Sequence, residues 1–264
     1  MANIVLIVSI IFVLTIVMIM SGRGGGNFYV IALVLSGVAM HTASTTSQFI
    51  LIGSALSGAL VFGKAKTMSW PLVFFFGGLN SLMAFIGGFE AHLFTGSALK
   101  IVLSVVLGIA GIIMLFPEKQ TSKSTVDRFG YWNIAEGENQ YVINLWIAVP
   151  LTMVTGFFAG MVGISGGSFL IPLMVIGSGV PMRTAVGTAT AILAATAFTG
   201  FLGNALQGGF DPDLAIPCGV VAIVGGLIGG KIALKTKPKS LKNISGIITI
   251  IAAGIMMVNT LTGL

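Results

Sequence analysis

The sequence predicts an all-α polytopic membrane protein with two inverted five-segment repeats and glycine-broken short helices. Three observations support this fold class: the composition, an internal repeat and the charges of the loops. Of the 264 residues, 56% are hydrophobic and 8% are charged, whereas about 25% of the residues in a soluble domain are charged. Because about 20 apolar residues can cross a bilayer as a helix, the repeated apolar runs are expected to be transmembrane helices.

The composition also argues against several other classes of protein. Apolar and polar residues do not alternate over strand-length segments, so an outer-membrane barrel is not expected. The net charge of +6 comes from Lys and Arg in short loops, which favours a topology signal over a nucleic-acid partner. The one cysteine, Cys218, lies in an apolar stretch and is expected to serve packing.

An internal repeat divides the chain into two halves. Residues 37–46 align with residues 179–188 at an offset of 142, and further blocks follow in the same order. A repeat of this kind fixes the architecture before any single element is assigned. The further matching blocks are 86–88 with 228–230, 98–100 with 240–242 and, after a one-residue gap, 25–28 with 166–169.

The repeat predicts the domain organisation. Residues 1–116 are expected to form the first transmembrane repeat, 117–140 a cytoplasmic linker, and 141–264 the second, inverted repeat. An odd number of segments in each half makes the second half enter the membrane in the opposite orientation. The expected segments are 2–20, 27–40, 43–62, 68–88 and 98–116, followed by 141–162, 167–180, 184–206, 213–233 and 241–261.

Loop charges test the inversion independently, because cytoplasmic loops carry an excess of Lys and Arg. The loop at 64–66 carries two lysines, whereas the equivalent loop at 211–213 carries two aspartates. Glu90 likewise corresponds to a cluster of lysines at 231–239. Placing the lysine loops and the linker in the cytoplasm leaves both termini outside.

The second and seventh segments are too short to span comfortably, since about 14 residues make a helix of about 21 Å. Both follow a glycine-rich break, at 22–26 and 163–167. A helix start offers unpaired N–H groups and the positive end of the dipole, so these breaks are expected to bind an anion. The alternative is that the glycines only permit a tight hairpin. The predicted ligand residues are Gly24, Gly25, Gly26, Asn27, Ser165, Gly166, Gly167 and Ser168.

A second polar cluster stands at the starts of the third and eighth segments. Hydroxyls there line a pathway in one interpretation and serve as caps or interhelical bonds in the other. Arg23 and Arg183 are expected to anchor at the lipid headgroups rather than to bind the ligand. A lone His41 is expected to have a structural role. The cluster residues included as binding candidates are His41, Thr42, Ser44, Thr45, Arg183, Thr184 and Thr188.

The stretch from Gly156 to Leu173, GFFAGMVGISGGSFLIPL, followed by AVGT at 185–188, resembles the sulfite exporter TauE/SafE family. The resemblance covers both repeats. It implies a protein of the bacterial inner membrane that moves sulfite, sulfonates or related organosulfur anions. The first copy departs from the pattern, with Arg23 inside the glycine run and Ile31 where the second copy has Pro172.

The expected function is therefore transport of a small anion, with export as the favoured direction. All seven acidic residues fall in or near expected loops, which favours passive or weakly coupled transport over proton coupling. A channel and a sodium- or proton-coupled uptake permease remain alternatives. An enzyme is not expected, because the two histidines are 51 residues apart and no metal-spaced cluster or paired carboxylates occur. No cofactor or metal is expected; the partners are the anion, the bilayer and a possible second copy of the chain.

Overall fold

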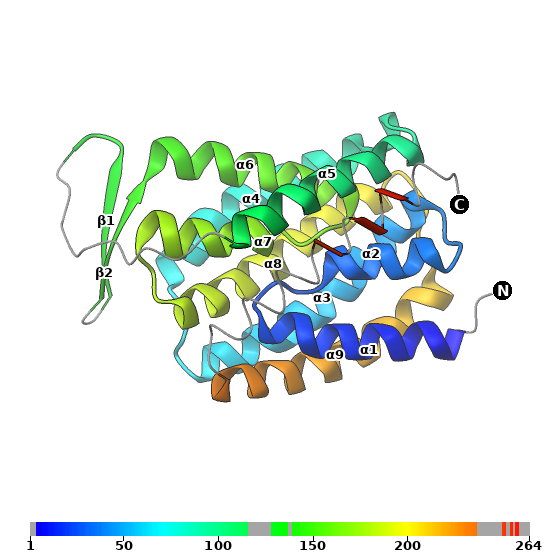
Figure 1. Cartoon of the computed structure of the whole chain (residues 1–264), viewed down its shortest axis with the longest axis horizontal. Coiled ribbons are helices and arrows are strands. Elements are labelled where there is room, and N and C mark those ends of the chain that lie inside the picture. The colour runs from blue at the N-terminus through cyan, green and yellow to red at the C-terminus, as the bar shows by residue number, and fades with distance from the viewer. Residues whose placement is uncertain are drawn as a thin grey trace.

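The structure is a computed structural model that describes residues 4–115, 128–136 and 139–236, with six further helical residues at 250–251, 254–255 and 257–258. Most of the expected tenth segment, 241–261, and residues 117–127 and 137–138 of the expected linker lie outside the described residues. Figure 1 shows the long helices lying side by side along the long axis, with a β-hairpin at one end.

The elements of the first half agree with the expected segments to within a few residues, except that the second segment ends earlier. Trp70 begins the fourth helix with Pro71 beside it, a position where the missing N–H of proline is harmless. The elements are α1 (Ile4–Met20), α2 (Gly26–Leu35), α3 (Met40–Lys64), α4 (Trp70–Glu90), the 3₁₀ turn η1 (Ala91–Leu93) and α5 (Gly96–Leu115).

The second half follows the same order after a pair of strands. Its helices begin at side-chain caps where the sequence supplies them: Asn144 Oδ1 accepts from Trp146 N, and Asp211 Oδ1 accepts from Leu214 N. The elements are β1 (Tyr131–Glu136), β2 (Asn139–Asn144), α6 (Leu145–Val162), α7 (Gly167–Pro172), the π-helical turn η2 (Leu173–Gly177), α8 (Met182–Ala205) and α9 (Pro212–Lys235).

The hairpin is a departure from the expectation of helices alone. Strands β1 and β2 pair antiparallel, with Tyr131 opposite Asn144. Ile134, Tyr141 and Ile143 are buried, because alternate residues of each strand face the protein. The strands occupy the end of the expected linker and the first residues of the expected sixth segment, so the helix there begins at Leu145.

Five of the described helices are long and apolar enough to cross a membrane. They are Met40–Lys64, Trp70–Leu93, Leu145–Val162, Met182–Ala205 and Pro212–Lys235. Helices α1, α2 and the described apolar part of α5 are shorter apolar helices. The prediction of a helical membrane protein is therefore confirmed at this coarse level.

The two halves of the chain interleave. Helix α4 of the first half packs against α6 and α8 of the second, and α9 of the second half packs against α1 and α3 of the first. Helices α3 and α8 pack against each other between these two groups. Each group of three helices thus contains helices from both halves.

Glycines allow the close approach of these helices, as the composition predicts. The Cα of Gly160 in α6 faces the Ala84 carbonyl of α4 so closely that a side chain there would overlap the backbone. In the other group, a Cβ on Gly229 of α9 would lie 2.6 Å from the Ile16 carbonyl oxygen of α1. Cys218 is buried in the apolar core, in agreement with its predicted packing role.

Candidate functional site

The two glycine-rich breaks, which are far apart in sequence, lie against each other. The backbone N–H of Ser165 in the second break donates to Asn27 Oδ1 at 2.9 Å. The Ser165 hydroxyl lies 3.3 Å from the same oxygen. Asn27 is 3% exposed and Ser165 is 1% exposed, so the contact is in the interior. Asn27, which the sequence predicts as a donor to an anion, here acts as an acceptor.

Both half-helices begin at this contact. Helix α2 begins at Gly26, and α7, which continues into η2, begins at Gly167. A Cβ on Gly26 would lie 3.0 Å from the backbone nitrogen of Ser165. The N-terminal ends of both helices therefore meet, and each carries the positive end of a helix dipole.

Left-handed backbone creates the breaks. Gly22, Gly24 and Gly25 have φ values of 74°, 73° and 90°, and Gly163 has a φ of 76°. Residues with a Cβ rarely adopt this conformation, so glycine is needed at these positions. Gly166 differs, because its φ is −66°.

Side chains from α3 hold the breaks together. The Ser47 hydroxyl lies 3.0 Å from the Gly26 carbonyl oxygen and 2.9 Å from that of Gly163, so one side chain reaches both breaks. Ser44, a predicted site residue, makes a longer contact of 3.4 Å with the Met161 carbonyl oxygen. Ser47 belongs to the polar run that the sequence singles out, but it was not among the predicted ligands.

Arg23 is buried inside the protein. It is 4% exposed, which contradicts the interpretation of this residue as a headgroup anchor. A Cβ on Gly167 would lie 3.2 Å from Arg23 Cα, so the arginine belongs to the meeting point of the breaks. A cation in a medium of low dielectric constant acts more strongly on an anion than it would in water.

Asn80 of α4 is a site residue that the sequence reasoning missed. It is fully buried, and its Nδ2 donates to Thr196 Oγ1 at 2.8 Å. Its Oδ1 has no hydrogen-bond partner among the described residues. A Cβ on Gly166 would lie 3.3 Å from Asn80 Nδ2, so this amide packs against the second break. The sequence feature that could have indicated this residue is a lone asparagine in an apolar segment.

Other predicted residues serve the ends of helices. Thr45 Oγ1 donates to the His41 carbonyl of its own helix at 3.0 Å. Thr42 lies beside Gly209, just before α9. Thr188 Oγ1 accepts the Ser69 N–H at 2.9 Å and so holds the start of α4. The cap and interhelical-bond interpretation describes Thr188 better than a pathway lining does, whereas the Thr45 hydroxyl bonds within its own helix.

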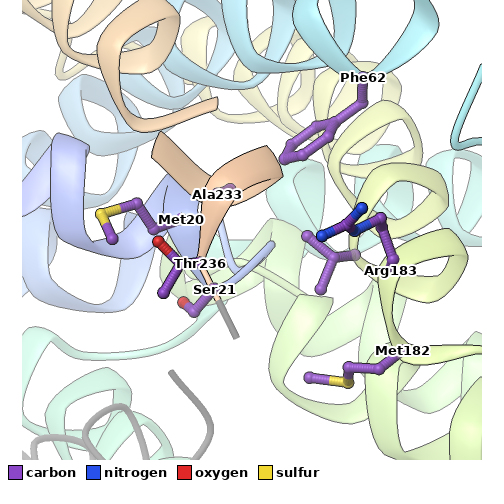
Figure 2. Close-up of a pocket in the computed structure, with 8 residues that line it drawn as sticks. Met20, Ser21, Phe62, Met182, Arg183, Ala233 and Thr236 are labelled. Atoms are coloured by element: carbon purple, nitrogen blue, oxygen red, sulfur yellow. The ribbon is translucent and has the colours of Figure 1, made fainter. Parts of the chain in front are cut away.

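Arg183 lines a separate pocket near the surface (Figure 2). Thr184 follows it in α8 and is half-buried. The backbone of Ser168 belongs to α7, but its side chain lies outside what the structure describes. The pocket is a small open hollow with a volume of about 20 Å³, and it is lined by Met20, Ser21, Phe62, Met182, Arg183, Val186, Ala233 and Thr236.

Comparison with known proteins gives a consistent result. The family model of the sulfite exporter TauE/SafE family matches residues 7–257. A probable membrane transporter protein YunE of Bacillus subtilis is 25% identical over 245 residues, which cover 87% of this chain and 88% of the relative. A probable membrane transporter protein of Xylella fastidiosa is 23% identical over 236 residues, with 87% and 86% covered. No solved structure is significantly similar to the chain.

Proposed function

The chain belongs to the sulfite exporter TauE/SafE family, and from this premise we propose that it carries small sulfur-containing oxyanions, sulfite or sulfonates, across the bacterial cytoplasmic membrane. Membrane transport is the function that the family and the relatives' descriptions share. The substrate, the outward direction and the central site are the parts that we propose.

The observation that carries the proposal is the meeting of two helix starts around a buried arginine. Ser165 N–H, the starts of α2 and α7, and Arg23 come together from both halves of the chain. Helix starts favour anions in many unrelated proteins. The Asn27 oxygen occupies the position in which an oxygen of a bound anion would accept from Ser165. We therefore expect the transported anion to replace Asn27 as the partner of this N–H.

Alternating access would follow from an inverted repeat. By the sequence alignment, α1, α3 and α4 are equivalent to α6, α8 and α9. Two sets of contacts support the inversion: α4 packs against α6 and α8, just as its equivalent α9 packs against α1 and α3. In the proposed mechanism, one group of helices rocks on the other and opens the breaks to each side in turn.

The membrane potential is the proposed driving force. An inside-negative potential favours anion exit by about 2.3 kcal/mol per charge for each 100 mV. Of the acidic residues that the structure describes, Glu90, Asp211 and Asp213 stand at the ends of helices, and Glu136 ends strand β1. The outward direction is therefore proposed to need no second ion.

Sulfite efflux from proteoliposomes tests the function. We expect saturable efflux that accelerates when the vesicle interior is made negative. Flux that does not saturate would favour a channel. Flux that ignores the potential but follows a sodium or pH gradient would favour a coupled permease. Absence of flux for sulfite and for small sulfonates would refute the proposed function.

A matched pair of glycine variants tests the location of the site. Gly26→Ala adds a methyl group 3.0 Å from Ser165 N, and we expect loss of most of the flux. Gly78→Ala in α4 adds the same group where nothing lies within 4 Å, and we expect unchanged flux. Equal flux in both variants would show that the meeting of the breaks is not the transport site.

A further inference from the structure

Close contacts in one half of the chain have counterparts in the other. A Cβ on Gly22 would lie 2.9 Å from Val186 Cα. The aligned residues approach each other in the same way, since a Cβ on Gly163 would lie 2.6 Å from Ser44 Cα. The contact of each break with the helix beside it is thus made twice, once at each aligned place. A contact that is made at only one of two aligned places shows where this conformation departs from that match.

One such contact holds the start of α4. The Ser69 N–H donates to Thr188 Oγ1 of α8 at 2.9 Å, and both residues are fully buried. The bond joins the two halves at the end of the molecule where α3 and α9 finish. This end, called here the lysine end, carries Lys64, Lys66, Lys231 and Lys235.

The loop from α3 to α4 packs closely against α8 beside this bond. A Cβ on Gly187 would overlap the carbonyl oxygen of Thr67, so the absence of a side chain at Gly187 allows the approach. Gly187 and Thr188 are adjacent in α8. The glycine contact and the hydrogen bond therefore fasten the loop to the helix at two neighbouring residues.

The aligned threonine lies in α3, toward the opposite end of the molecule. Thr46 aligns with Thr188, and Asp211, which precedes α9, aligns with Ser69. Thr46 is fully buried, but its Oγ1 has no hydrogen-bond partner among the described residues. The bond that Thr188 makes at the lysine end thus has no counterpart at Thr46 in this conformation.

The loop before α9 is also packed more loosely than the loop before α4. Asp211 is half-buried, whereas the aligned Ser69 is fully buried. Gly209 aligns with Thr67, and a Cβ there would meet nothing nearer than Thr42 Oγ1, at 3.8 Å. The two ends therefore differ both in the hydrogen bond and in the packing of the loop that would make it.

The unpartnered hydroxyl gives this difference an energetic meaning. A buried hydroxyl without a hydrogen bond is unfavourable, because it has left water and gained no partner. In alternating access between inverted repeats, each end is closed in turn. If the two ends exchange their packing, Thr46 gains a partner while Thr188 loses one, so the two conformations remain close in free energy.

We propose that Thr188 and Thr46 are the acceptors of two alternating gate bonds. In this conformation Thr188 accepts the Ser69 N–H and holds the lysine end closed. In the opposite conformation that bond is broken, and Thr46 accepts the Asp211 N–H at the other end. The proposal deepens the proposed function and rests on its alternating access, but it does not depend on which anion is carried.

Sided labelling of a thiol at the gate tests the proposal. Ser69→Cys keeps the backbone N–H and places a thiol where the native side chain is fully buried. A membrane-impermeant maleimide therefore reaches this thiol only when the lysine end opens. The full-length chain also carries Cys218→Ala, so that no second thiol is present. The measurement is the rate of labelling from the lysine end of oriented membrane vesicles.

The same substitution at the two gates should have opposite effects. We expect Thr188→Val to accelerate labelling about tenfold, because the closed lysine end loses one hydrogen bond. We expect Thr46→Val to slow labelling about tenfold, because the conformation with an open lysine end loses its bond at the other end. Changes in the same direction, or an unchanged rate in Thr46→Val, would overturn the proposal.

Two controls separate the gate bond from a general loss of packing. Thr188→Ser restores a hydroxyl and should return the rate to that of the parent. Thr190→Val removes a buried hydroxyl that bonds the Val186 carbonyl of its own helix, and the rate should not change. Equal acceleration by Thr188→Ser and Thr188→Val, or by Thr190→Val and Thr188→Val, would show an effect of packing and overturn the proposal.

Sulfite flux distinguishes a failure of the gates from a failure of the proposed function. Labelling that responds to Thr188 and Thr46 as expected, in a protein that carries neither sulfite nor small sulfonates, would refute the proposed substrates and leave the gates standing. Saturable sulfite flux, with labelling that responds to neither threonine, would refute the gate bonds and leave the transporter standing.

Discussion

The two glycine breaks look equivalent in sequence but differ in structure. The first break contains three left-handed glycines, Gly22, Gly24 and Gly25, and the second contains one, Gly163. The first also carries the buried Arg23 in the middle of its turns. The first break therefore depends on glycine at more positions than the second, although the two runs align.

The helices that follow the breaks differ as well. Helix α2 runs regularly for 10 residues, from Gly26 to Leu35. Helix α7 has 6 residues and passes at Pro172 into the π-helical turn η2. Proline has no N–H and crowds the carbonyl four residues earlier, so the regular ladder shifts there.

We propose that the two breaks have separate tasks. The first supplies the positive charge, and its backbone conformation is fixed by glycine. The second supplies the Ser165 N–H and leads into an irregular helix, a feature common at functional sites. We infer that the first break is the fixed side of the site and that the second is the side that adjusts during transport.

The largest expected effect is a difference in stability between variants at two aligned glycines. Gly25→Ala forces a Cβ into a left-handed position 2.7 Å from the Tyr29 ring, and we expect destabilisation of about 3 kcal/mol. At the aligned Gly166, the φ of −66° accepts alanine, and the cost should stay below about 1 kcal/mol. Melting temperatures of the two variants measure the difference. Equal destabilisation would mean that the breaks are structurally equivalent after all.

The second prediction concerns the charge of the first break. Arg23→Gln should reduce sulfite transport about a hundredfold, because a charged contact in the interior contributes about 3 kcal/mol. Flux normalised to the amount of folded protein is the measurement. Lys64→Gln, which removes an exposed charge at the end of α3, is the control. Wild-type flux in Arg23→Gln would move the anion site away from the first break.

A smaller effect is expected where α3 holds both breaks. Ser47→Ala removes the hydroxyl that lies within 3.0 Å of the carbonyl oxygens of both Gly26 and Gly163. We expect destabilisation of about 1 to 2 kcal/mol. Ser44→Ala removes one contact of 3.4 Å and should matter less. Comparable melting temperatures for the two variants would show that Ser47 does not join the breaks.

Much of this architecture could be predicted from local patterns in the sequence. Apolar length and loop charge located the helices, and the glycine runs located both breaks. The contact between the breaks was out of reach, because Asn27 and Ser165 meet only when helices of the two halves interleave. Burial of Arg23 was likewise out of reach, since a short sequence pattern does not distinguish an arginine at the membrane surface from one buried inside the protein.

The hairpin and Thr188 show a second limit of local patterns. Apolar or aromatic residues stand at every second position in Trp132 and Ile134 and again in Tyr141 and Ile143, a pattern typical of strands. The pattern covers only a few residues and lies beside a charged segment, so it was not interpreted as a hairpin. Thr188 aligns with a polar run, yet it bonds the start of α4. A hydroxyl in a membrane helix has several possible partners, and only the packing decides among them.

The smallest expected effect concerns the irregular helix after the second break. Pro172→Ala supplies the missing N–H and allows α7 to continue as a regular helix, so the protein should gain up to about 1 kcal/mol of stability. If η2 must deform during transport, the maximum flux should fall severalfold while the half-saturating sulfite concentration changes little. Pro150→Ala removes a proline from within the α-helix α6 and should leave the flux unchanged. Undiminished flux in Pro172→Ala would place the adjusting side of the site elsewhere, because a regularised helix would then carry the anion equally well.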